Sequence, residues 1–151
     1  GSMRAVVQRV KRAAVSVDGK SVSSIDRGMM VLVGISSEDT KKDMEYIGNK
    51  IAGLRIFEDD EGVMNINAKD SESEIMIVSQ FTLYGDGRKG NRPSYIRAAK
   101  GDVSEPMYED LIRYVELKGF AVAKGKFGAD MAIDMVADGP VTILLDSERG
   151  F

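Results

Sequence analysis

The feature that most restricts the fold is the continuous apolar run MMVLVGI at residues 29–35, bounded by Gly28 and Ser36. A run of this length without alternation is typical of a strand that is buried on both faces of a sheet. The segment SEIMIVSQFTL (73–83) is the next strongly apolar stretch and is also expected to be a strand. We therefore expect a sheet whose central strands are covered on both sides.

Two helices and several shorter strands are expected around these strands. One helix is predicted from a cap at Ser37 to about Gly53, and another from near Ser104 to Lys118-Gly119. The further expected strands cover residues 4–10, 13–19, 54–57, 131–135 and 141–146, the last two as partners joined by a turn. Together these elements predict an α+β domain with a curled, barrel-like β-sheet and its two main helices packed outside.

One domain is expected over residues 3–151, because no repeat, low-complexity segment or linker divides the chain. Gly1-Ser2, before Met3, is interpreted as an expression remnant. No apolar run approaches the length of a membrane span, which predicts a soluble, cytoplasmic protein with no membrane partner.

The chain contains neither histidine nor cysteine. This excludes a Ser-His-Asp triad, an imidazole base, a thiolate nucleophile and zinc bound by His or Cys. Catalysis must then rest on carboxylates, lysines, hydroxyls, backbone N–H groups or groups of the substrate itself. No metal and no cofactor are expected.

The net charge of −3 does not suggest a general nucleic-acid binder, but the charge is unevenly distributed. Residues 87–100 hold five basic side chains and no acidic one. The segment 85–101 has little periodicity and is expected to be a long loop, which favours a functional role. A phosphate-binding surface and a solvated loop both remain open for it.

The first candidate for chemistry is SQFT, formed by Ser79, Gln80, Phe81 and Thr82. A strand that ends in these residues exposes hydroxyls, an amide and successive backbone N–H groups. Such N–H groups can stabilise the negative charge that develops on a carbonyl oxygen during acyl transfer. The alternative is a strand end whose polar residues only complete the ladder.

The second candidate is GDGRKGNRPSY (85–95), in which glycines allow close approach and Arg88, Lys89 and Arg92 can hold phosphates. The alternative is a flexible hairpin tip. The spacing matches no Walker or Rossmann fingerprint, so it does not support nucleoside triphosphate chemistry. The G-x-x-G spacing of GKFGADM (125–131) lacks the helical context of a KH loop.

The third candidate is ADGPVT (137–142). Asp-Gly before a strand is typical of a hairpin turn, and proline cannot donate to a ladder, so a turn is the simplest interpretation. However, Gly139 has no Cβ, and an X-Pro bond can be cis, so the carbonyl groups around Pro140 can face a ligand.

Taken together, the chain resembles the D-aminoacyl-tRNA deacylase family, also called D-tyrosyl-tRNA deacylases. The resemblance covers almost the whole chain, and the ordered set of segments is specific although each one is weak. The matching segments are QRV (8–10), GMMVLVG (28–34), LRIF (54–57), GVMN (62–65), SQFTL (79–83), KGNRPSY (89–95), FGADM (127–131) and DGPVT (138–142).

The resemblance implies a homodimer of barrel-like subunits, with active sites at the interface, that hydrolyses the ester between a D-amino acid and tRNA. Glycine mischarged onto tRNA is a further implied substrate. It also implies that Gly139 and Pro140 form a cis peptide bond that reaches into the partner subunit's site and faces the amino group and Cα of the substrate. An L side chain would collide with these carbonyl groups, whereas a D side chain points away.

The resemblance also implies a role for each motif residue. Gln80, Phe81 and Thr82 lie at the ester, with the N–H groups of Phe81 and Thr82 as oxyanion donors and Ser79 nearby. Thr82 is a candidate nucleophile, but nothing in the chain supplies a base for it, which favours assistance by a ribose hydroxyl. Arg9 braces the Gly-Pro segment, and the tRNA-binding residues are Arg88, Lys89 and Arg92.

The departures from the family pattern are small. Ala137 stands where the family usually has Asn, Val63 where Lys is common, and Tyr95 where Phe is common. The first of these removes a polar side chain beside the Gly-Pro turn. Two other functions remain as alternatives: a non-catalytic tRNA- or RNA-binding module, and a hydrolase of an unrelated small ester.

Overall fold

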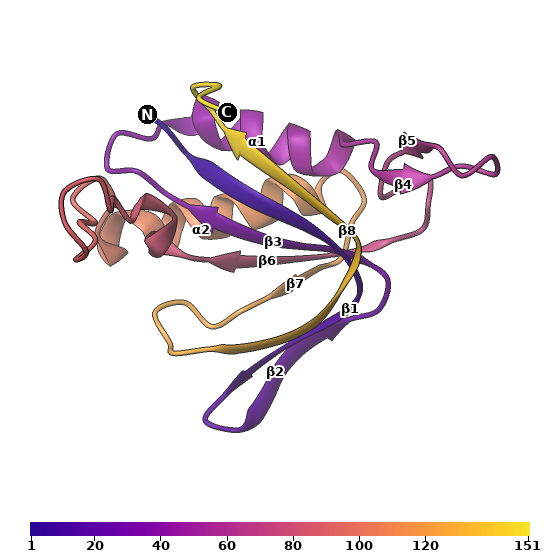
Figure 1. Cartoon of the computed structure of the whole chain (residues 1–151), viewed down its shortest axis with the longest axis horizontal. Coiled ribbons are helices and arrows are strands. Elements are labelled where there is room, and N and C mark those ends of the chain that lie inside the picture. The colour runs from indigo at the N-terminus through magenta and orange to yellow at the C-terminus, as the bar shows by residue number, and fades with distance from the viewer.

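One long strand organises the sheet. In the computed structural model, which describes residues 1–151, β1 (Arg4–Val17) pairs along most of its length with β8 (Ala132–Asp146). On its other side β1 pairs first with β3 (Gly28–Gly34) and then with β2 (Lys20–Ile25), both antiparallel. Because β1 changes partner halfway, the sheet curls instead of lying flat (Figure 1).

The sheet continues from β3 through two parallel neighbours, β6 (Glu74–Ser79) and the short β7 (Val122–Lys124). The curl brings β7 back toward β2, where the Ser23 hydroxyl donates a hydrogen bond to the Lys124 carbonyl at 2.5 Å. The result is a mixed, barrel-like sheet, as the sequence predicted. A small hairpin of β4 (Phe57–Glu58) and β5 (Met64–Ile66) stands apart from it.

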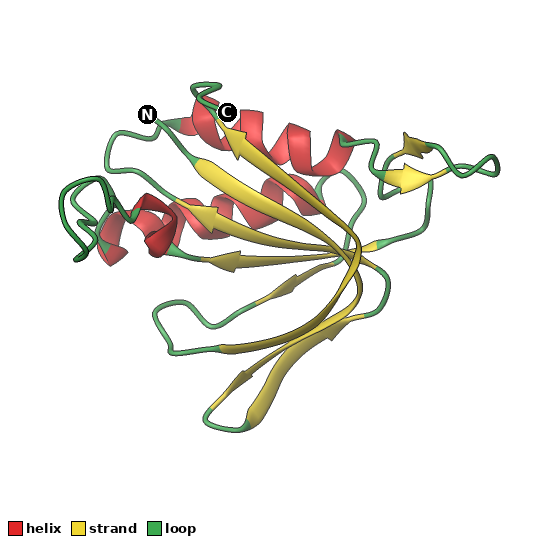
Figure 2. Cartoon of the chain, viewed as in Figure 1, coloured by secondary structure: helices red, strands yellow, loops and turns green.

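Two helices, α1 (Lys41–Gly53) and α2 (Gly101–Glu116), cover the outer face of the sheet (Figure 2). The main core lies between them and the sheet and includes Met29, Val31 and Val33. The alternate residue Met30 belongs to a second buried cluster, which lies inside the curl. The strand at 28–34 is therefore buried on both faces, which confirms the interpretation of its apolar run. No helix is long and apolar enough to span a membrane.

The helix starts differ from those expected. α1 begins after Thr40 and not at Ser37, because the Asp43 carboxylate accepts a hydrogen bond from the Thr40 N–H at 2.8 Å and fixes the first turn. α2 begins at Gly101, three residues before Ser104. The loop between Gly85 and Lys100 has no regular element, as expected.

The prediction that 131–135 and 141–146 are hairpin partners is wrong. Residues 132–135 and 141–146 belong to the single strand β8, which pairs with β1 on both sides of the break. The two strands expected at 4–10 and 13–19 are likewise one strand, β1, which ends at Val17. The register passes from Gln8↔Thr142 to Val10↔Ala137, so residues 138–141 leave the ladder opposite Arg9. The Asp-Gly-Pro segment is thus an irregular break within one long strand.

Candidate active site

The SQFT residues lie at the C-terminal end of β6, where the strand leaves the sheet. The strand ends at Ser79, and the Gln80 N–H donates to the Val33 carbonyl of the neighbouring β3 at 2.7 Å. After Gln80 the chain continues into a short 3₁₀-helix, η1 (Phe81–Tyr84). Figure 1 shows this end of β6 beside the long loop at the left of the molecule.

A hollow of about 280 Å³, here called the strand-end pocket, opens at this point. Ser79, Gln80 and Phe81 line one part of it, and Phe127, Gly128, Ala129 and Met131 of the β7–β8 connection line another. The other lining residues follow the end of β3 or lie just before or at the start of α2. The lining residues are Ile35, Ser79, Gln80, Phe81, Ala99, Gly101, Ser104, Phe127, Gly128, Ala129 and Met131.

The backbone of η1 offers hydrogen-bond donors beside this pocket. Phe81 and Thr82 are its first two residues, and the N–H groups at the start of a helix have no acceptor within it. The Leu83 N–H already donates to the Gln80 carbonyl at 3.4 Å, and the Gly85 N–H to the Thr82 carbonyl at 2.9 Å. The free donors are therefore those of Phe81 and Thr82.

None of the side chains that line the strand-end pocket is acidic or basic. Its polar groups are the hydroxyls of Ser79 and Ser104 and the amide of Gln80. Thr82 is exposed next to the pocket and does not line it. No group of three or more carboxylates is placed to hold a metal ion. The groups that the chain places here are therefore hydroxyls, an amide and backbone N–H groups, and N–H groups of this kind can polarise a carbonyl.

The Gly-Pro segment lies elsewhere on the chain. Gly139 and Pro140 are exposed, they are joined by a cis peptide bond, and neither lines the strand-end pocket of its own chain. Arg9 is buried beneath this segment, with Nε 3.3 Å from the Asp138 carboxylate. The Arg9 Nη1 donates to the Ile56 carbonyl at 2.7 Å. This buried guanidinium ties the break in β8 to the segment that follows α1.

The basic residues of the long loop differ in whether they form an ion pair within the chain. Arg88 makes two hydrogen bonds to the Asp86 carboxylate, at 2.9 and 2.8 Å, and these lower the pKa of Asp86 to about 2. The same contacts raise the pKa of Arg88. Lys89 and Arg92 are exposed and form no ion pair. Arg88 is therefore held in place, whereas the other two are free to meet a ligand.

The residues that the β7–β8 connection contributes to the strand-end pocket were not predicted as site residues from the sequence. The residues concerned are Phe127, Gly128, Ala129 and Met131. They belong to the segment with the G-x-x-G spacing, and in the sequence only the family motif FGADM marks it. Ala137, the departure beside the Gly-Pro segment, is exposed and opposes Val10 in the ladder.

Comparisons with known proteins agree with this architecture. The family model described as D-Tyr-tRNA(Tyr) deacylase matches residues 6–146. A D-aminoacyl-tRNA deacylase from Desulfatibacillum aliphaticivorans is 52% identical over 97% of this chain and all of its own. Another, from Thermotoga petrophila, is 51% identical over 99% of this chain and all of its own.

Two solved structures share the fold. One, titled c-Myc DNA Unwinding Element Binding Protein, has a TM-score of 0.88 and 43% identity, over 94% of this chain and 97% of its own. The other, titled as a probable eukaryotic D-amino acid tRNA deacylase, has a TM-score of 0.82 at 20% identity, over 97% of this chain and all of its own. At that identity it supports the fold alone. The family model and the relatives at about half identity establish that the chain belongs to the D-Tyr-tRNA(Tyr) deacylase family of enzymes.

Proposed function

We propose that the protein hydrolyses the ester bond of D-aminoacyl-tRNA, and of tRNA mischarged with glycine, to free amino acid and tRNA. The observation that carries this proposal is the strand-end pocket. The pocket is lined by no ionisable side chain, and the free N–H groups of Phe81 and Thr82 lie beside it. This arrangement suits stabilisation of an oxyanion and leaves proton transfer to the substrate.

The reaction proceeds by attack of water on the ester carbonyl carbon. The carbonyl oxygen gains negative charge and is held by the N–H groups of Phe81 and Thr82. The neighbouring hydroxyl of the terminal ribose orients the water and accepts its proton, while its own proton passes to the departing ribose oxygen. The bond from the carbonyl carbon to that oxygen then breaks, which yields the carboxylic acid and the free ribose hydroxyl. Ser79 and Gln80 position the ester.

The chirality of the substrate is read by a second copy of the chain. The exposed Gly139-Pro140 segment does not line the pocket of its own chain, so it is available to enter the pocket of a partner in a homodimer. Its carbonyl groups then face the amino group and Cα of the amino acid. An L side chain must occupy the same space and is excluded, a D side chain points away, and glycine has none. The tRNA end is steered by Arg88, Lys89 and Arg92.

The function is tested by incubating the purified protein with D-Tyr-tRNA and following the release of tyrosine. We expect hydrolysis that exceeds the spontaneous rate by at least about 1,000-fold, because each oxyanion donor contributes about 100- to 1,000-fold. The rival function is a non-catalytic RNA-binding module, which the basic loop favours. Tight, salt-dependent binding of tRNA without hydrolysis of any aminoacyl ester would establish the rival. Equal activity on simple esters without tRNA would indicate a general esterase.

The role of Thr82 is tested by the variant Thr82→Ala, which keeps the backbone N–H and removes the hydroxyl. We expect single-turnover hydrolysis of D-Tyr-tRNA to stay within about tenfold of the wild type, because no group of the pocket activates that hydroxyl. Thr82→Ser, which keeps the hydroxyl, is the matched control. A loss of more than about 1,000-fold in Thr82→Ala, with an unchanged unfolding midpoint and an active Thr82→Ser, would establish a threonine nucleophile instead.

A further inference from the structure

A second hollow lies at the far end of η1 and differs from the strand-end pocket in character. Its volume is about 290 Å³, and no apolar side chain lines it. It is called the arginine pocket here. Its lining residues are Arg4, Gly85, Asp86, Gly87, Arg88 and Arg97.

The buried ring of Tyr84 contacts two of the arginines that line the arginine pocket. The Tyr84 hydroxyl lies 2.6 Å from the Ser2 carbonyl oxygen and 2.9 Å from that of Gly34. The guanidinium carbons of Arg4 and Arg97 lie 5.3 and 5.9 Å from the centre of this ring. One fixed aromatic ring therefore holds two cations at the same pocket.

The positive charge of the arginine pocket is only partly compensated. Arg88 is paired with Asp86, as described above, so these two cancel. Arg4 donates to the Leu83 carbonyl at 3.1 Å, and its Nε forms a long ion pair, at 4.0 Å, with the buried Asp146 carboxylate. The Nε is buried and has no hydrogen-bond partner.

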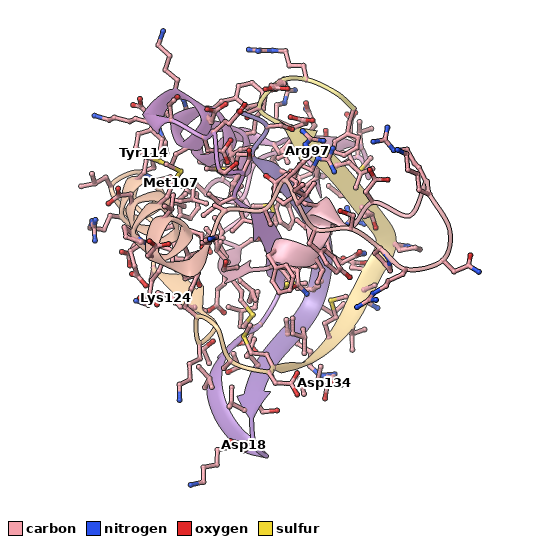
Figure 3. All side chains as sticks on the ribbon, turned by 90° about the vertical axis from the view of Figure 1, so that its left-hand side faces the viewer. Asp18, Arg97, Met107, Tyr114, Lys124 and Asp134 are labelled. Atoms are coloured by element: carbon pink, nitrogen blue, oxygen red, sulfur yellow. The ribbon has the colours of Figure 1, made fainter.

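Arg97 is the more available of the two cations. Its side chain is exposed and makes neither a hydrogen bond nor an ion pair. In Figure 3 it lies above η1, beside the long loop. A Cβ added to Gly87 would meet no atom within 4 Å, so this wall leaves room for a ligand. Two guanidinium groups around an open polar hollow match a phosphate group, whose oxygens accept paired N–H bonds.

Two exposed aromatic rings connect the arginine pocket to the strand-end pocket. Phe81, a wall of the strand-end pocket, packs edge-on against Tyr95 with ring centres 5.3 Å apart. A Cβ at Gly85, a wall of the arginine pocket, would lie 3.1 Å from the Tyr95 ring. The two pockets are separated by the four residues of η1, about 8 Å of helix. Exposed aromatic side chains beside basic pockets are the usual platform for unpaired bases.

We propose that the arginine pocket binds a phosphodiester of the single-stranded 3′ end of the RNA substrate. Arg4 and Arg97 hold the phosphate, and the edge-on pair of Phe81 and Tyr95 offers one exposed ring face on which a base stacks, between the phosphate and the ester. This inference rests on the proposed function and adds to it a defined phosphate site formed by two arginines outside the steering set of Arg88, Lys89 and Arg92.

The test compares KM and kcat for D-tyrosyl esters of tRNA, of the 3′-terminal trinucleotide and of adenosine, which lacks a phosphodiester. In Arg97→Gln and Arg4→Gln, KM should rise about tenfold for tRNA and the trinucleotide and stay unchanged for adenosine, with kcat unchanged throughout. Arg97→Gln carries the test alone if Arg4→Gln does not fold. The matched control, Lys20→Gln, removes one exposed charge beside Asp18, at the opposite end of the molecule in Figure 3, and should change nothing.

A binding measurement keeps this test separate from the chemistry. The 3′-terminal trinucleotide without an attached amino acid should bind Arg97→Gln about tenfold more weakly than it binds the wild type, and its binding should depend less steeply on salt. This result is expected even if the wild type hydrolyses no ester. The same KM increase on the adenosine ester, or no change on the trinucleotide, would overturn the proposal. So would inorganic phosphate that binds the wild type as tightly as the trinucleotide does, since the pocket would then be a site for free phosphate.

Discussion

Gly139→Ala is expected to lower single-turnover hydrolysis of D-Tyr-tRNA by at least about 100-fold. Gly139 has φ of +111°, a conformation that L side chains rarely adopt. A Cβ there would lie 3.0 Å from Cγ2 of Val141, 3.1 Å from its backbone nitrogen and 3.2 Å from Nη2 of Arg9. Since the backbone nitrogen and the buried arginine have little freedom, residues 138–141 must shift. A shift of about 1 Å in a positioning group is enough to cost two orders of magnitude in rate.

The control for this variant is Gly62→Ala. Gly62 also has a positive φ, +77°, but a Cβ there meets nothing within 4 Å. We expect it to cost about 1 kcal/mol of stability and to leave the rate of hydrolysis unchanged. If Gly139→Ala hydrolysed D-Tyr-tRNA at a rate within about threefold of the wild type, the Gly-Pro segment would not contact the substrate.

Arg9→Met should both destabilise the protein and impair catalysis. The variant keeps much of the aliphatic volume of Arg9 but removes the guanidinium, which leaves the Ile56 carbonyl without its donor and Asp138 without a counter-charge. Because Asp138 is about one-third exposed, the expected loss is about 2 kcal/mol, below that of a fully buried pair. This corresponds to a fall of roughly 4–8 °C in the unfolding midpoint. The rate of hydrolysis should fall at least about tenfold, since the Gly-Pro segment loses its brace.

Arg12→Met is the matched control, because Arg12 lies on the same strand but is exposed and forms no ion pair. It should change neither the unfolding midpoint nor the rate. If Arg9→Met lowered the midpoint and left both kcat and KM for D-Tyr-tRNA unchanged, the brace would serve folding alone, and its proposed role in catalysis would be wrong.

The strands and helices of the core were predictable because each carries its own pattern. The apolar run at 29–35 is buried on both faces, and Met44, Ile47 and Ile51 fall on one face of α1, where they are buried. The continuity of β8 was not predictable. Asp-Gly-Pro has the local signature of a hairpin turn, and only the matching length of β1 shows that both flanking segments extend one strand.

Some residues of the candidate site were also predictable from the sequence, and others were not. The position of Ser79, Gln80 and Phe81 at the strand-end pocket was predictable, since they follow directly on the apolar part of β6, and Thr82 lies beside the pocket without lining it. Phe127 and Met131 belong to the connection between β7 and β8, and no local pattern indicates that this connection lines the strand-end pocket. Arg4 and Arg97 are far apart in the sequence and meet only over the Tyr84 ring. Such pairings are set by tertiary packing and not by spacing.

The function proposed for this site is hydrolysis of aminoacyl-tRNA, with backbone groups that select the chirality of the amino acid. It is tested most directly by measuring, with one preparation, the single-turnover rates for D-Tyr-tRNA and L-Tyr-tRNA. We expect the D ester to be hydrolysed at least about 100-fold faster, because a rigid backbone excludes the L side chain. Equal rates for the two esters would contradict it.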